Sequence, residues 1–130
     1  MAVTHNVARQ EVIAAYVDFA FGDLTTGTEV DALLLPANAR VVGGQVDITT
    51  AWDSATSDVV VVGIGTETLL SSTSIAALGS TLFDDSQAIK TTAETEVTLA
   101  WTGVGAVPAA GAGVLTVLYV VEGRACFTQG

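Results

Sequence analysis

Alternation of apolar and polar residues is the main pattern along this chain. From Val12 to Phe21 the odd positions are apolar and Asp18 falls on the even positions, which predicts a half-buried strand. Glu94–Thr102 alternates in the same way, and Val114–Glu122 is a continuous apolar and β-branched run. All three segments are typical of strands that turn one face to a core.

Two further strands are predicted in the first half of the chain. Thr28–Leu35 ends at Pro36, which cannot donate a hydrogen bond to a sheet. Ala39–Trp52 follows, and Gly43-Gly44 within it predicts a bulge or bend. The apolar residues that share one parity in this segment, and are therefore expected on one face, are Val42, Val46, Ile48 and Trp52.

Turn-forming residues separate these segments. Asp53–Asp58 has the composition of a turn, and Val59–Ile64 after it has that of a returning strand, which predicts a β-hairpin with the preceding strand. Thr68–Phe83 is rich in Ser and Thr, so we expect a long irregular loop with at most one helical turn. Gly103–Gly113 is expected to form a flexible, uncharged loop.

These elements define the fold class. Six strands are clear, seven or eight are possible, and neither a sustained helical period nor a β–α alternation is present. The prediction is an all-β, antiparallel β-sandwich, with a jelly roll as the favoured topology. We expect an N-terminal arm at 1–10, the sandwich domain at 11–124 and a C-terminal tail at 125–130.

Composition points to protein partners. The chain has 14 acidic and 4 basic residues in 130, a net charge of −10, which argues against nucleic acid as a ligand because phosphates are bound by clustered Lys and Arg. Half of the residues are apolar and only 14% are charged. A domain this small leaves much of its surface exposed, so part of this apolar surface is expected to be buried against other subunits.

Candidate chemistry is sparse, and we expect no enzymatic activity and no cofactor. Cys126 is the only cysteine and His5 the only histidine, and no nucleophile, metalloprotease or phosphate-loop motif is present. Asp53, Asp58 or the pair Asp84 and Asp85 could bind a cation such as Ca²⁺, although solvated turn residues are the favoured interpretation.

Targeting and membrane signals are also missing. The first residues have neither a basic region nor a long apolar region, so no secretory signal is expected. The longest apolar runs are far shorter than the roughly 20 residues of a membrane-spanning helix. Trp52 and Trp101 share parity with the apolar faces of their segments and are expected in the core, not on a carbohydrate-binding surface.

Two stretches of the chain resemble a known family. They are Leu33–Ile48 with the following Thr-Ala-Trp-Asp-Ser, and Val97–Gly103 continued through Gly111–Val114 to Tyr119–Ala125. Their arrangement of strands and glycines resembles the small proteins of tailed bacteriophages that decorate or cement the capsid beside the major capsid protein. Gly63-Ile64-Gly65-Thr66 departs from that pattern, because it lacks an Asp that follows the glycine there.

The resemblance implies a structural virion protein on the outer surface of the capsid, made in the host cytoplasm. Its partners would be the major capsid protein and further copies of itself, as a homotrimer or alternatively a homodimer, with no nucleic acid or membrane. The arms are the expected interface, with the candidate residues Val3, His5, Val7, Arg9, Arg124 and Phe127. Another phage structural subunit, such as a head-fibre base, tail or head-completion protein, and a carbohydrate-binding module are the alternatives.

Overall fold

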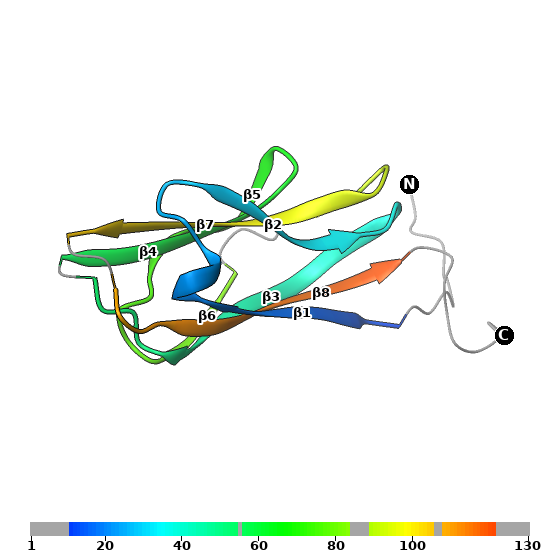
Figure 1. Ribbon diagram of the computed structural model, residues 1–130. Helices are drawn as coiled ribbons and strands as arrows, with labels where there is room; N and C mark the ends of the chain where they lie inside the picture. The colour runs from blue at the N-terminus through cyan, green and yellow to red at the C-terminus, as the bar shows by residue number, and fades with distance from the viewer. Residues whose placement is uncertain (1–10, 55, 84–88, 106–107, 122–130) are drawn as a thin grey trace, which may run out of the picture.

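The computed structural model describes residues 11–54, 56–83, 89–105 and 108–121, which form a sandwich of two sheets (Figure 1). A short 3₁₀ helix, Phe21–Asp23, follows the first strand. The eight strands are β1 Ile13–Ala20, β2 Glu29–Leu35, β3 Ala39–Thr50, β4 Ser57–Ile64, β5 Glu67–Ser74, β6 Gly79–Leu82, β7 Thr95–Val104 and β8 Ala112–Val121.

The strand order is nested. One sheet has the order β1-β8-β3-β6 and the other β2-β7-β4-β5, and all pairs are antiparallel. The first strand therefore pairs with the eighth, the second with the seventh, the third with the sixth and the fourth with the fifth. This is the order of one long antiparallel hairpin wound into two layers. The predicted all-β, antiparallel β-sandwich is confirmed, and a jelly roll stays the favoured topology.

The predicted hairpin between Ala39–Trp52 and Val59–Ile64 is wrong. β3 pairs with β8 and β6, whereas β4 pairs with β7 and β5 in the other sheet. The turn at residues 53–58 thus carries the chain from one layer to the other. Turn composition alone does not distinguish a hairpin from a crossover between sheets, because both need the same polar, loop-forming residues.

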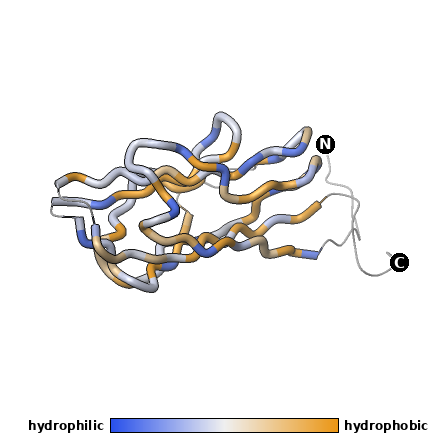
Figure 2. The backbone as a smooth tube through the Cα atoms, in the orientation of Figure 1, coloured by the Kyte–Doolittle hydropathy of each residue, from blue (hydrophilic) through white to orange (hydrophobic). Residues whose placement is uncertain are grey.

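The core lies between the two layers and follows the predicted alternation. Inward positions of β7 and β8 are almost fully buried, among them Val97, Leu99, Leu115 and Val117, each at most 1% exposed. The indole rings of Trp52 and Trp101 pack against each other at one end of the sandwich, with centroids 5.1 Å apart and planes tilted by 48°. Figure 2 shows hydrophobic residues along the strands of both layers.

A bulge in β3 changes which side chains face the core. The register with β8 shifts between Val41 and Gly43, as the two glycines predict. Val41 is 2% exposed, whereas Val42 is 48% exposed and lies on the outer face. The assignment of Val42 to the same face as Val46 is therefore wrong, because one extra residue in a strand reverses the parity of what precedes it.

The segment Thr68–Phe83, predicted as a long irregular loop, contains most of β5 and all of β6. β5 lacks a clean alternation because Leu69 and Leu70 are adjacent and both buried, at register irregularities against β4. β6 has only four residues, none of them fully buried. Neither strand therefore has the period-two pattern from which strands are predicted.

The edge of β3 beyond β6 is covered by residues 89–91. The backbone N–H of Val41 donates to the carbonyl of Ile89, and that of Thr91 donates to Ala39. The buried Thr91 hydroxyl donates to the carbonyl oxygen of Pro36 at 2.6 Å and accepts from the N–H of Ala39 at 2.9 Å. This hydroxyl fixes the β2–β3 turn against the segment that precedes β7.

Candidate interaction surfaces

The outer face of the β1-β8-β3-β6 sheet carries a group of exposed apolar side chains. In an antiparallel sheet with one face on the core, the other face usually carries polar residues. Here the exposed fraction is 68% for Tyr16, 69% for Leu82, 48% for Val42 and 59% for Val12. We define the apolar face as these four residues together with their outward-facing neighbours Ala14, Val114, Leu118 and Val120.

The strand register places these side chains in rows across the four strands. Tyr16 of β1 lies opposite Thr116 of β8, Thr116 opposite Gln45 of β3, and Gln45 opposite Leu82 of β6. In the next row, Leu118 lies opposite Gly43, where a side chain would only just reach the Leu118 methyl group at 4.0 Å. The absence of a side chain at Gly43 thus leaves the middle of the apolar face flat.

The polar residues near the centre of this face are bonded to one another. The side-chain amide of Gln45 donates to both carboxylate oxygens of Asp47, at 2.9 and 2.8 Å, and the Ser80 hydroxyl also donates to this carboxylate. A carboxylate that already accepts hydrogen bonds loses less when water is removed than a free one does. These hydrogen bonds lower the desolvation cost of covering Asp47 relative to a carboxylate without partners.

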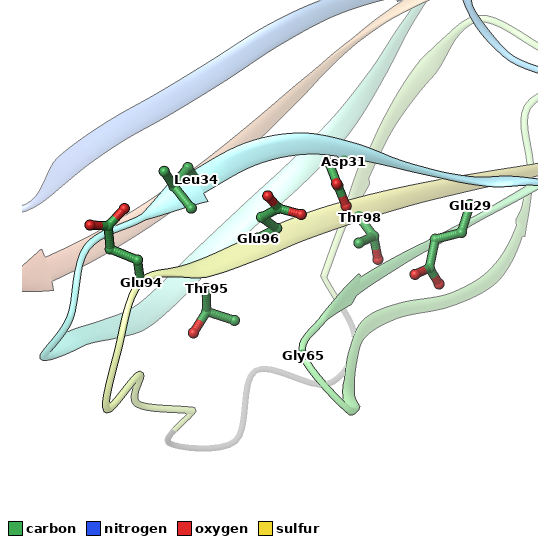
Figure 3. A pocket seen from close by; sticks show the side chains of 8 residues that line it. All are labelled: Glu29, Asp31, Leu34, Gly65, Glu94, Thr95, Glu96 and Thr98. Atoms are coloured by element: carbon green, nitrogen blue, oxygen red, sulfur yellow. The ribbon is translucent and has the colours of Figure 1, made fainter.

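The opposite outer face, along β2 and β7, is acidic. Glu29, Asp31, Glu94 and Glu96 project from it around a shallow depression that Thr95, Thr98, Leu34 and Gly65 also line (Figure 3). A hydrogen bond with the Asp31 side chain raises the pKa of Glu96 above its usual value, and desolvation and repulsion by Asp31 raise it further. The two carboxyl groups are thus close enough to compete for one proton.

The two faces differ in what they can bind. The outer face of one sheet combines the apolar face with polar residues, among them Asp18, Arg40 and Asp47, whereas carboxylates and hydroxyl groups dominate the β2–β7 part of the other. An apolar surface is stabilised by contact with another protein, whereas a carboxylate surface is stabilised by water and repels other anionic surfaces. The two outer faces of the sandwich are therefore suited to different surroundings, one to contact with a protein and the other to solvent.

The acidic turn residues suggested as cation ligands have structural roles where the structure describes them. Asp58 is 1% exposed, and it accepts hydrogen bonds from the Trp101 indole at 2.8 Å and from the Ser54 hydroxyl and N–H at 2.6 and 2.8 Å. Asp53 accepts from the N–H groups of Ala109 and Ala110 at 2.8 and 3.1 Å. Asp84 and Asp85 lie outside the described residues, and the described part of the chain has no cluster of three or more potential ligands.

The interface residues suggested in the arms, namely Val3, His5, Val7, Arg9, Arg124 and Phe127, all lie outside the described residues. The apolar face was missed because its apolar residues are divided among four strands, and in β1 and β3 they share the outward parity with polar residues such as Asp18 and Asp47. Val114–Val121 gave a signal, since an uninterrupted apolar run indicates a strand covered on both faces. Trp52 and Trp101 are 2% and 5% exposed, which confirms their prediction as core residues.

Comparison with known proteins identifies similar folds. No protein-family model matches the chain, and no curated protein sequence matches it. A chain in the capsid asymmetric unit of cyanophage Pam1 is 20% identical with a TM-score of 0.69, and the match covers 94% of this chain and 93% of that one.

The residues described here contain no helix long and apolar enough to cross a membrane.

Two further capsid structures contain similar chains. The match to the capsid of Ralstonia phage GP4 has a TM-score of 0.64 at 18% identity and covers 95% of this chain and 93% of that one. For the acidic stable capsid of Helicobacter pylori bacteriophage KHP30 the TM-score is 0.63 at 20% identity, with 91% and 90% covered. Each match extends over nearly the whole sandwich and establishes the shared fold.

Proposed function

We propose that this chain is a structural subunit of a bacteriophage capsid that binds the outer surface of the shell and cements neighbouring major capsid subunits. The apolar outer face of the β1-β8-β3-β6 sheet carries this proposal. It would pack against the shell, and the acidic β2–β7 face would point to solvent. The fold shared with chains of phage capsid structures supports a role in the virion.

The size of the apolar face indicates how such a subunit would be held. Strands β1, β8 and β3, with about seven residues each, and β6, with four, give a flat area on the order of 400 Å² at about 4.8 Å between strands and about 3.3 Å per residue. One such contact buries about 800 Å² on both partners together, which is below the usual size of a stable specific interface. Stable attachment therefore requires several linked contacts, which a symmetric oligomer provides.

A homotrimer fits this requirement best in our proposal, and a homodimer is the second choice. Each subunit would contribute one apolar face, and each face would lie across a boundary between capsid subunits. Linked contacts of this kind resist separation of the shell subunits more than any single contact does. The proposed role depends on binding alone and involves no catalysis or cofactor.

Burial of both tryptophans makes the alternative of a carbohydrate-binding module less favourable. Such modules place aromatic rings on the surface, whereas Trp52 and Trp101 are buried and pack against each other inside the sandwich. The exposed aromatic residues among those described are Tyr16 and Phe21. Tyr16 lies within the apolar face, where it fits a protein contact.

Binding to phage heads tests the proposal. Expanded heads that lack this chain would be mixed with the labelled protein, and the bound fraction measured by sedimentation. Leu82→Asp should weaken binding at least about tenfold, because a leucine of this exposure contributes about 1.5–3 kcal/mol when a partner covers it. Ser72→Asp, which adds the same charge on an exposed position of β5, should bind like the original protein.

The outcomes separate this proposal from the alternative roles. Equal loss of binding in Leu82→Asp and Ser72→Asp would mean that overall charge, and not the apolar face, controls binding. Failure of the unmodified protein to bind heads, together with binding to tails or necks, would favour a different structural subunit. Light scattering of the free protein measures whether it is a trimer, a dimer or a monomer.

A further inference from the structure

Among the four edge strands of the sandwich, β1 is the one with an open edge. The strands at the sheet edges are β1, β6, β2 and β5. Natural proteins protect edges by short length, bulges or charges. β6 has four residues, β2 has a bulge and two carboxylates, and β5 has register irregularities against its partner and begins with Glu67.

β1 has almost none of these protective features. Its eight residues pair with β8 without a register shift, and they include no proline, glycine or lysine and one charged residue, Asp18. The backbone groups on its outer side have no strand partner within the described part of the chain. Such an edge offers a regular row of donors and acceptors to an added strand.

A groove runs beside this edge. It has a volume of about 200 Å³ and separates β1 from β2, the edge strand of the other sheet. Val17 and Phe19 line it from β1, Val30 and Ala32 from β2, with Leu24 and Leu99 behind. Val17, Val30 and Ala32 are only partly buried, so apolar side chains from an added strand would complete the core at this side.

We propose that the N-terminal segment 1–10 of a second copy of this chain occupies the β1 edge and the adjoining groove. In this segment Val3, His5, Val7 and Arg9 alternate with Thr4, Asn6, Ala8 and Gln10, so an extended strand would place both valines on one face, together with His5 and Arg9. Extended, ten residues span about 33 Å, enough to follow all of β1. The inference goes beyond the proposed function and does not depend on a capsid.

Charge complementarity supports this occupant. The groove is bordered by Asp18, Asp23 and Asp31. Segment 1–10 contains Arg9 and His5 and no acidic residue, in a chain whose net charge is −10. Arg9 would thus approach a rim of carboxylates, where opposite charges attract even at the surface.

The occupant is a second copy because the segment cannot easily fold back on its own strand. A tight hairpin onto β1 would have to reverse the chain at Gln10-Glu11-Val12, which contains none of the Gly, Asn or Asp residues that two-residue turns require. Residues 11 and 121 lie at the same end of the β1-β8-β3-β6 sheet. A neighbouring copy can therefore present its segment from that end.

Paired substitutions in the full-length chain test this inference. Val3→Asp with Val7→Asp places two charges on the side that would enter the groove, and Thr4→Asp with Ala8→Asp places the same two charges on the other side. The first variant should dissociate into monomers, with the association constant lowered about 100-fold or more, because each buried valine contributes about tenfold. The second variant should keep the mass of the original protein in light scattering.

Hydrogen exchange of residues 13–20 supplies a second measurement. In the original protein these amides should exchange slowly on both sides of β1. In the Val3→Asp, Val7→Asp variant they should exchange faster. An excess of a synthetic peptide of residues 1–10 should restore slow exchange in that variant. Equal behaviour of the two double variants, or a monomeric original protein, would overturn the inference. A monomer with a protected β1 edge would mean that the segment folds back on its own strand.

Discussion

Replacing Asp58 with alanine should destabilise the sandwich more than any other change of a single carboxylate in the described residues. The Asp58 side chain is 1% exposed and accepts three hydrogen bonds, from the Trp101 indole, the Ser54 hydroxyl and the Ser54 N–H. Alanine removes all three acceptor contacts and leaves the indole N–H, on a side chain that is 5% exposed, without this partner.

The magnitude follows from these contacts. An unsatisfied buried donor costs about 1–3 kcal/mol, and the loss of the two bonds to Ser54 adds about 1 kcal/mol each. We therefore expect Asp58→Ala to lower the free energy of unfolding by about 3–5 kcal/mol, a large share of the roughly 5–15 kcal/mol of a typical domain. The melting temperature should fall by about 10–20 °C for a domain of this size.

Denaturant unfolding followed by tryptophan fluorescence measures this loss, because Trp101 and Trp52 report on the same region. Asp53→Ala is the matched control: its carboxylate accepts two hydrogen bonds from exposed loop amides, so its loss should stay near 1 kcal/mol. The loss of stability in Asp58→Asn should lie between the losses in Asp58→Ala and Asp53→Ala, since an amide oxygen can still accept a hydrogen bond from the Trp101 indole. If Asp58→Ala and Asp53→Ala were equally stable, the buried network would not hold this end of the sandwich.

Three further changes test other parts of the fold. Glu96→Gln should stabilise the protein near pH 7 but not at pH 4, measured as melting temperature: a raised pKa in the folded state favours the protonated form, and that contribution is lost as pH rises through it. Equal effects of Glu67→Gln and Glu96→Gln at both pH values would contradict the pairing with Asp31. Gly111→Ala should cost about 2 kcal/mol or more, read from denaturant unfolding, because φ is +154° and a Cβ would lie 2.6 Å from the Trp52 ring. Thr91→Val should cost about 1–3 kcal/mol by the same assay, since the Ala39 N–H would lose its acceptor, and an unchanged stability would refute this role.

The strands predicted best were those with a regular period of two. β1, β2, β7 and β8 alternate or run continuously apolar, and their bounds agree with the prediction to within a few residues. The bulge at Gly43-Gly44 was predicted as well, but its effect on Val42 was not, because a parity count assumes an unbroken strand. β5 and β6 were missed since irregular pairing and short length remove the pattern.

The candidate surfaces depended on the pairing of strands far apart in sequence. Tyr16 and Leu82 are 66 positions apart and become part of one row only through β8 and β3. Periodicity indicates which residues share a face within a strand, but not which faces join across a sheet. The burial of Asp58 was unpredictable for the same reason, since its indole partner lies 43 positions away.

The most direct test of the proposed function is a cryo-EM reconstruction of phage heads saturated with this protein. Our account predicts density for the sandwich on the outside of the shell, at boundaries between major capsid subunits, with Tyr16 and Leu82 facing the shell and Glu29 and Glu96 facing solvent. Density located in the tail or neck, or a sandwich seated with the β2–β7 face against the shell, would contradict it.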